Sequence, residues 1–161
     1  MGTDIYLNWN KKSEIESEEQ MTGFSIDAGR VGYLRASIGM VAENELLRAV
    51  FPIELWEGSE DIKPFDFKGH YERTLNIGIR YLLGLPITLE EKAFENLQKQ
   101  VAMGSAVKKM VDKMGFENTM LNDDSSDIRS RVMFINSVWS FFELGMEKQE
   151  AGLEPVVEIS W

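Results

Sequence analysis

The sequence contains no cysteine and a single histidine, His70. Without cysteine there is no disulfide framework, no thiolate metal ligand and no cysteine nucleophile. One histidine cannot by itself build the two- or three-histidine sites typical of catalytic zinc. We therefore expect no metal site. The lack of cysteine also suits a reducing, cytoplasmic environment.

Basic runs are scarce as well. Only short pairs such as Lys11-Lys12 and Lys108-Lys109 occur, and 27 acidic residues against 17 basic ones give a formal net charge of −10. Because phosphate contacts depend on Lys and Arg, direct binding of DNA or RNA is not expected. The charge would also repel anionic lipids, and no apolar run approaches the roughly 18 residues of a membrane span. No secretory signal is visible after Met1, so we expect a cytoplasmic protein without membrane association.

Motifs for common chemistries are also missing. The chain has no G-x-S-x-G nucleophile elbow and neither glycine-rich phosphate-binding pattern, so no cofactor is expected. Gly29 and Gly32 stand close to Arg30 and Arg35, and together they could present backbone N–H groups and two cations to an anion. Alternatively, these glycines only form the turn before a helix.

What the sequence does contain is period-two alternation at both ends. Ile5, Leu7 and Trp9 alternate with polar residues, which predicts a half-buried strand. Residues 154–161 alternate in the same way, and residues 22–27 are a weaker candidate. Short strands with one covered face favour a small antiparallel sheet. We expect the ring of Trp161 to cover the core of that sheet.

The rest of the chain is predicted to be mainly helical. Residues 10–21 are rich in glutamate and predict a solvated connection with at most one helical turn. Apolar residues at helical spacing predict four helices, and the last of them is apolar over so much of its circumference that we expect it at the centre. Their ranges are 29–51 with a kink near Asn44 or a division there into two short helices, 69–83, 88–114 and 128–146. The sequence thus predicts one domain, residues 1–161, of the α+β class, with a helical body of about four helices and a small antiparallel sheet of N- and C-terminal strands.

The connection over residues 52–69 is the main candidate for a binding site. It exceeds the roughly 4–6 residues of most connections and carries Trp56, Phe65 and Phe67. Long aromatic loops can be lids or docking sites, but their rings can also pin the loop to the core.

A polar group follows directly in the sequence. Asp66, His70 and Arg73 have the spacing of one helix face, with Tyr71 beside them. An Asp that orients a His is one component of general-base catalysis, although the same residues can simply form a polar helix face. The full candidate site consists of Trp56, Phe65, Asp66, Phe67, His70, Tyr71 and Arg73.

Three functions are compatible with these patterns. We expect a small intracellular binding or accessory protein without catalytic activity, which binds itself or another protein. The first alternative is a small enzyme or ligand carrier with a pocket under residues 52–69. The second is an acidic decoy of a nucleic-acid-binding protein.

Overall fold

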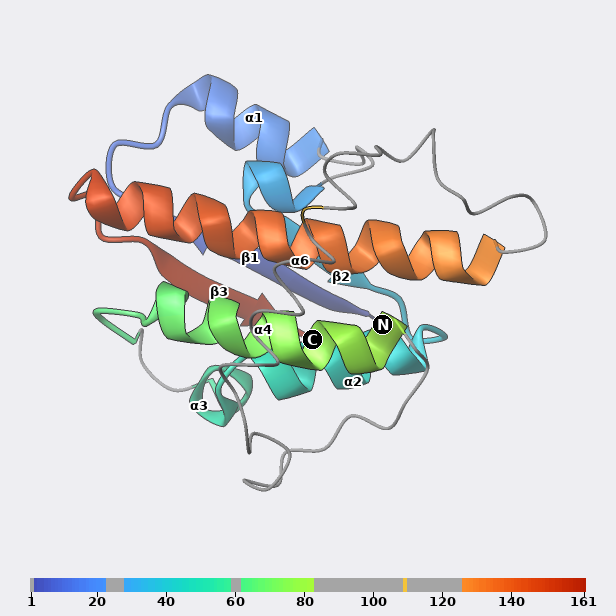
Figure 1. The fold of residues 1–161 in the computed structure, drawn as a ribbon. Helices are drawn as coiled ribbons and strands as arrows, with labels where there is room; N and C mark the ends of the chain where they lie inside the picture. Colours follow the sequence, from blue (N-terminus) through green and yellow to red (C-terminus); the bar gives the residue numbers. More distant parts are fainter. Residues whose placement is uncertain (1, 23–27, 59–61, 83–108, 110–125) are drawn as a thin grey trace.

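The computed structural model describes residues 2–22, 28–58, 62–82, 109 and 126–161 (Figure 1). Three strands form an antiparallel sheet in the order β2-β1-β3, namely β1 (Thr3–Asn8), β2 (Tyr33–Ala36) and β3 (Val156–Ser160). The helices are α1 (Glu14–Thr22), α2 (Val41–Val50), α3 (Ile53–Trp56), α4 (Phe67–Leu82) and α6 (Ser126–Glu150), with a 3₁₀ turn η1 (Ala28–Val31). The α+β class is confirmed, and so is a sheet built from the two ends of the chain.

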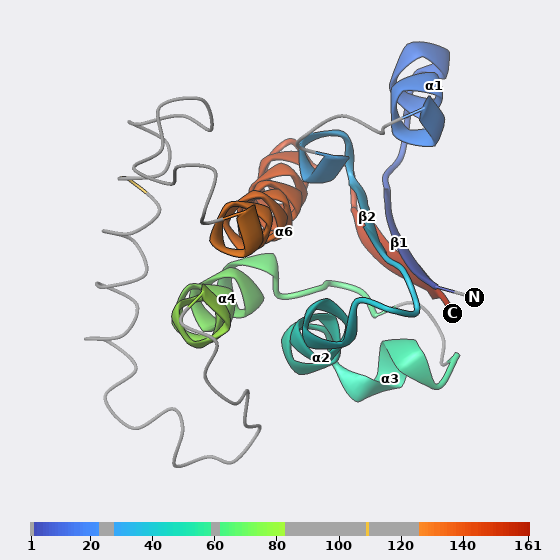
Figure 2. The same ribbon diagram turned by 90° about the vertical axis from the view of Figure 1, so that its right-hand side faces the viewer.

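The sheet has one face covered by helices. Figure 2 shows α2, α4 and α6 together on one side of it, with α1 set apart near the end where β1 finishes. The N- and C-termini lie next to each other at the opposite end, in agreement with the pairing of Asp4 with Ser160.

The predicted alternation of the terminal strands is confirmed by burial. Ile5 and Leu7 are fully buried against the helices, and Val157 of β3 is 3% exposed. Trp161 differs from the expectation, because it follows the end of β3 and remains 61% exposed. Its ring lies over the exposed Arg48 guanidinium, and its Nε1–H donates to the Trp56 carbonyl at 2.9 Å. Trp161 therefore packs at the rim of the core and does not cover it.

Helix α6 supplies the centre of the core, as its sequence predicted. Ile135, Val138, Trp139, Phe141 and Phe142 are all fully buried. Two separate elements, α4 and η1, pack on α6. A helix buried from several directions needs an apolar surface over most of its circumference.

The helix predicted over residues 29–51, kinked near Asn44 or divided there into two short helices, is wrong for the first part of the range. This range holds η1, the short strand β2 and helix α2. Leu34, Ile38 and Val41 have helical spacing, but only Leu34 is buried, and it pairs with Ile5 of β1. A strand of four residues is too short for its periodicity to be distinguished from a helical stripe, so cross-strand pairing decides its structure.

Helix α1 is also longer than expected. The Glu16 N–H donates to Ser13 Oγ at 3.1 Å, and the Ser13 N–H donates back to Glu16 Oε1 at 3.2 Å. This reciprocal pair is a capping box, which satisfies two backbone donors at the start of a helix. The strand predicted over residues 22–27 lies outside the described residues except for Thr22, which ends α1; the helix predicted over 88–114 lies outside them except for Lys109.

Candidate functional site

The three aromatic residues of the predicted loop site lie in the core. Trp56, Phe65 and Phe67 are 5%, 1% and 0% exposed. The centroids of the Phe65 and Phe67 rings are 4.6 Å apart, and Trp56 Nε1–H donates to the Phe51 carbonyl at 3.3 Å. These contacts hold both ends of the 52–69 segment against the helices, so the packing of the core explains all three rings.

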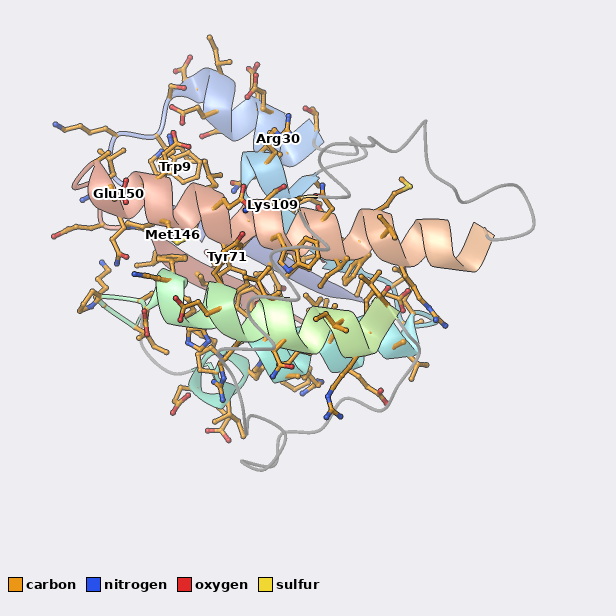
Figure 3. The ribbon with its side chains drawn as sticks, in the orientation of Figure 1. Trp9, Arg30, Tyr71, Lys109, Met146 and Glu150 are labelled. Carbon is orange, nitrogen blue, oxygen red and sulfur yellow. The ribbon has the colours of Figure 1, made fainter. Side chains whose placement is uncertain are left out.

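Asp66 and Tyr71 have structural partners. The Gly69 N–H donates to Asp66 Oδ1 at 2.9 Å, which makes Asp66 the N-terminal cap of α4. Tyr71 lies between α4 and α6 (Figure 3), and its hydroxyl donates to Glu143 Oε1 at 3.3 Å. Arg73 is exposed on α4.

His70 is held in a mostly apolar environment. Its ring stacks on Phe65 with 4.8 Å between centroids, and its buried Nδ1 has no hydrogen-bond partner among the described residues. Burial, followed by the charge of Arg73, lowers the pKa of His70, although Asp66 counteracts this in part. A neutral imidazole packed against Phe65 and Phe142 is the role that this geometry supports.

The two arginines of the predicted anion site are on different surfaces. Arg30 lies on η1 near α1 (Figure 3), beside a small hollow of about 60 Å³ that Glu16 and Glu19 also line. Arg35 lies on β2, where its Nε is 3.8 Å from Asp4 Oδ1. Neighbouring carboxylates therefore compensate the charge at both positions.

A larger groove lies at the end of the sheet where the two termini meet. It encloses about 410 Å³. We call it the sheet-end groove; its lining residues are Gly2, Thr3, Ile38, Val41, Asn44, Glu45, Arg48 and Trp161. Ile38, Val41 and Trp161 are 76%, 63% and 61% exposed. They make up half of the six large apolar side chains that are exposed among the described residues.

Arg48 is the cation of the sheet-end groove. Its guanidinium carbon lies 4.7 Å from the centre of the Trp56 ring and 5.6 Å from that of Trp161. Both distances are within the range of favourable cation–π contact. Two indole rings thus orient Arg48, and no ion pair to it is found among the described residues.

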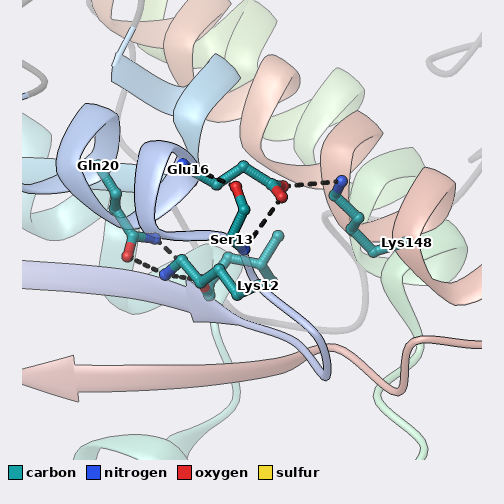
Figure 4. A network of polar contacts seen from close by, with 6 residues as sticks. Lys12, Ser13, Glu16, Gln20 and Lys148 are labelled. Atoms are coloured by element: carbon teal, nitrogen blue, oxygen red, sulfur yellow. Dashed lines mark hydrogen bonds and ion pairs between the residues drawn. The ribbon is translucent and has the colours of Figure 1, made fainter.

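A polar network joins α1 to the sheet at the opposite end (Figure 4). Gln20 is 5% exposed, and its Nε2 donates to the carbonyls of Leu7 and Gly32, each at 2.8 Å. The Lys12 ammonium donates to Gln20 Oε1, and Lys148 Nζ lies 3.3 Å from Glu16 Oε2. Burial lowers the pKa of Lys12. The network explains the position of α1 through structural contacts.

Within the described part of the chain, no three His, Asp or Glu side chains are grouped as a metal site would require. None of the helices described there combines the length and apolar character that a bilayer crossing needs. No protein-family description, curated protein or solved structure matches the sequence or the fold. Inferences about function therefore depend on the geometry of this chain itself.

The sequence patterns did not indicate the sheet-end groove. Its residues come from β1, the β2–α2 connection, α2 and the C-terminus, so only the folded chain brings them together. The sequence contained one indication of it. Ile38 and Val41 would belong to a buried stripe only if a helix covered residues 29–51. Once β2 is recognised, these two side chains have no core to enter.

Proposed function

We propose that this protein is a binding protein without catalytic activity that self-associates through the outer edge of β3. The supporting observation is the hydrogen-bond pattern of the sheet. The Leu7 N–H donates to the Gly32 carbonyl at 2.8 Å, so odd-numbered residues of β1 direct their backbone groups toward β2. Even-numbered residues of β1 then bond to β3, through the opposed pairs Tyr6–Glu158 and Asn8–Val156.

The alternation leaves the other backbone groups of β3 facing outward. The N–H and C=O groups of Val157 and Ile159 point away from β1, and the described residues include no further strand beside β3. Unpaired edge groups are a ready template for another strand. Antiparallel pairing of β3 with β3 of a second copy is self-complementary about a twofold axis, which is the commonest symmetry of protein dimers.

The side chains of β3 offer little protection against such pairing. Glu158 is its one charged residue, and its carboxylate accepts a hydrogen bond from Asn8 Nδ2 at 3.0 Å on the outer sheet face. Natural sheets usually protect an exposed edge with lysine, proline or a covering helix. Here the helix that contacts β3 is α3, whose four residues are shorter than the strand. Pro155 comes just before the strand and leaves the outward N–H groups of Val157 and Ile159 intact.

The net charge opposes association. Two copies at −10 each repel one another, and salt screens this repulsion as the Debye length falls from about 10 Å at 0.1 M to about 3 Å at 1 M. Self-association is therefore expected to strengthen with ionic strength, contrary to the behaviour of a dimer held by ion pairs.

The test combines sedimentation with amide hydrogen exchange over a range of salt and protein concentrations. A dimer should form at high salt, and the amides of Val157 and Ile159 should become protected as it forms. The amides of Glu158 and Ser160, which face β1, are the internal control and should be protected in monomer and dimer alike. A monomer at every salt concentration, or a dimer whose Val157 and Ile159 amides still exchange rapidly, would refute the proposal.

The alternative functions receive less support. A groove of about 280 Å³ borders the 52–69 segment at Lys63 and Pro64, but none of the seven predicted site residues lines it. No specific arrangement among the described residues favours an acidic decoy.

A further inference from the structure

We infer that the sheet-end groove binds a small molecule with an apolar body and one carboxylate group. This inference is independent of self-association, because the groove lies at the end of the strands and not along the outer edge of β3.

The apolar part of the ligand corresponds to the exposed side chains. Ile38 and Val41, three residues apart around the start of α2, line one hollow together with Trp161 at the C-terminus. Covering apolar surface from water contributes about 25 cal/mol per Å². Ligand sites typically combine such walls with a few polar groups, in volumes of roughly 300–1,000 Å³. The 410 Å³ of this groove is at the small end of that range.

The neutral polar side chains of the groove are already bonded to each other or to the backbone. Thr3 Oγ1 donates to Asn44 Oδ1 at 2.9 Å. Asn44 Nδ2 donates to the carbonyls of Ser37 and Met40 at 2.9 and 2.8 Å. These groups need no ligand, so the polar part of recognition falls to the charged side chains.

Arg48 gives the groove its preference for an anion. The guanidinium carbon lies over the rings of Trp56 and Trp161, and no hydrogen bond from its N–H groups to another described residue is found. A carboxylate is the natural acceptor for this planar fork. Trp161 then has two roles, since it orients Arg48 and also forms part of the apolar wall.

Glu45 limits the affinity. It lies three residues before Arg48 on α2 and also lines the groove. Its carboxylate repels an anionic ligand, so removing that charge should tighten binding. This opposite effect of two neighbouring side chains distinguishes carboxylate binding from nonspecific adsorption to an apolar patch.

The volume sets the size of a suitable probe. At roughly 30 Å³ for each non-hydrogen atom, by analogy with a water molecule, the groove holds about a dozen such atoms. Decanoate has this size. Decanol and decylammonium have the same chain with a neutral and a cationic head, so they are matched controls.

The experiment is a titration below the micelle concentration, followed through the indole N–H signals of the four tryptophans by NMR. A Trp161→Phe variant assigns the Trp161 signal, and the buried Trp139 serves as the internal reference. Decanoate should shift the Trp161 signal in a saturable way, with an affinity about five-fold above that of decanol and further above that of decylammonium.

Two variants complete the test, both checked for native circular dichroism. Arg48→Gln should weaken decanoate binding about five-fold and leave decanol unchanged, whereas Glu45→Gln should tighten decanoate binding alone. Equal affinity for the three probes, no effect of Arg48→Gln on decanoate, or shifts that miss Trp161 would each overturn the inference. The titration measures ligand binding by the monomer. If it fails, the proposal that β3 forms a dimer still stands, and if the dimer is refuted, the proposal of ligand binding still stands.

Discussion

The ring of Phe67 lies directly against the backbone of Gly145. A Cβ atom at residue 145 would be 2.2 Å from Phe67 Cδ1 and 2.4 Å from Cε1. Both distances are far below van der Waals contact, and Phe67 is fully buried at the start of α4. The absence of a side chain at Gly145 is therefore what allows α4 and α6 to approach each other at this point.

Gly145→Ala should destabilise the protein. Alanine gains about 1 kcal/mol of helix propensity over glycine, but overpacking a rigid core costs about 1–3 kcal/mol. We expect a net decrease in the free energy of unfolding of about 1 kcal/mol, measured by urea denaturation. Phe67→Leu in the same chain should recover part of the loss, because the clash involves the ring.

The matched control is Gly39→Ala, where the added Cβ meets no atom within 4 Å. This variant should have nearly wild-type stability. If Gly145→Ala and Gly39→Ala behave alike, the close approach of α4 and α6 is not the constraint that the geometry indicates.

Gln20→Ala should destabilise the junction between α1 and the sheet. It removes a donor from the buried carbonyls of Leu7 and Gly32. The Leu7 N–H still donates to the Gly32 carbonyl, so the Leu7 carbonyl is the group that loses most. Unsatisfied buried groups cost about 1–3 kcal/mol, and the loss should be visible in urea denaturation. Glu19→Ala, at an exposed position in the same helix, is the control and should change stability by less than about 0.5 kcal/mol. Equal effects of the two substitutions would contradict the structural role of Gln20.

Some of this fold could be predicted because its patterns are long or strong. The alternation of Ile5, Leu7 and Trp9 and the broad apolar surface of α6 each repeat often enough to define a buried face. The capping box of Ser13 and Glu16 was also present, but the glutamate-rich composition around it favoured a solvated connection. A local hydrogen-bonded signal was a better guide there than average polarity.

Other features depend on contacts between distant segments. Strand β2 has four residues, and its pairing with β1 outweighs any local preference. The aromatic residues of segment 52–69 could be core or surface by composition, and only the packing of Phe65 and Phe67 decides between the two. The sheet-end groove is least predictable, since Arg48 and Trp161 are 113 positions apart in the sequence.

Tyr33 should ionise only at high pH, and its ionisation should then destabilise the folded protein. Burial, followed by its hydrogen bond to Asp4 Oδ1 at 2.5 Å, raises the pKa of Tyr33 to about 12. Because the folded pKa lies above the unfolded value of about 10, the stabilising contribution is complete below pH 10 and is lost as the pH rises toward 12.

Phenolate absorbance measures this titration. Burial also raises the pKa of Tyr81, so Tyr33→Phe identifies the component that belongs to Tyr33. Asp4→Asn should lower the pKa of Tyr33 but keep it above 10, because burial remains the larger cause. A Tyr33 that titrates near 10 in the folded protein would show that the phenol is not held in this way.

His70 should make the protein less stable as the pH falls below about 6.5. Burial and Arg73 lower the pKa of His70, while Asp66, the Val50 backbone and Glu54 oppose this effect. Above 6.5 the ring is neutral in both the folded and the unfolded chain, so its contribution is fully present. Below pH 6.5 the imidazole takes up a proton in the unfolded chain but stays neutral in the folded chain. The free energy of unfolding therefore declines until the pH reaches the lowered pKa.

A titration with an imidazole pKa can be assigned to His70, because it is the only histidine in the sequence. The free energy of unfolding, measured by urea denaturation between about pH 5.5 and 7.5, should fall toward acid with a slope of at most about 1.4 kcal/mol per pH unit. His70→Gln keeps a polar side chain at this position but cannot titrate, so this slope should disappear. If the slope persists in His70→Gln, another group is responsible, and the burial of a neutral imidazole is not the cause of the pH dependence.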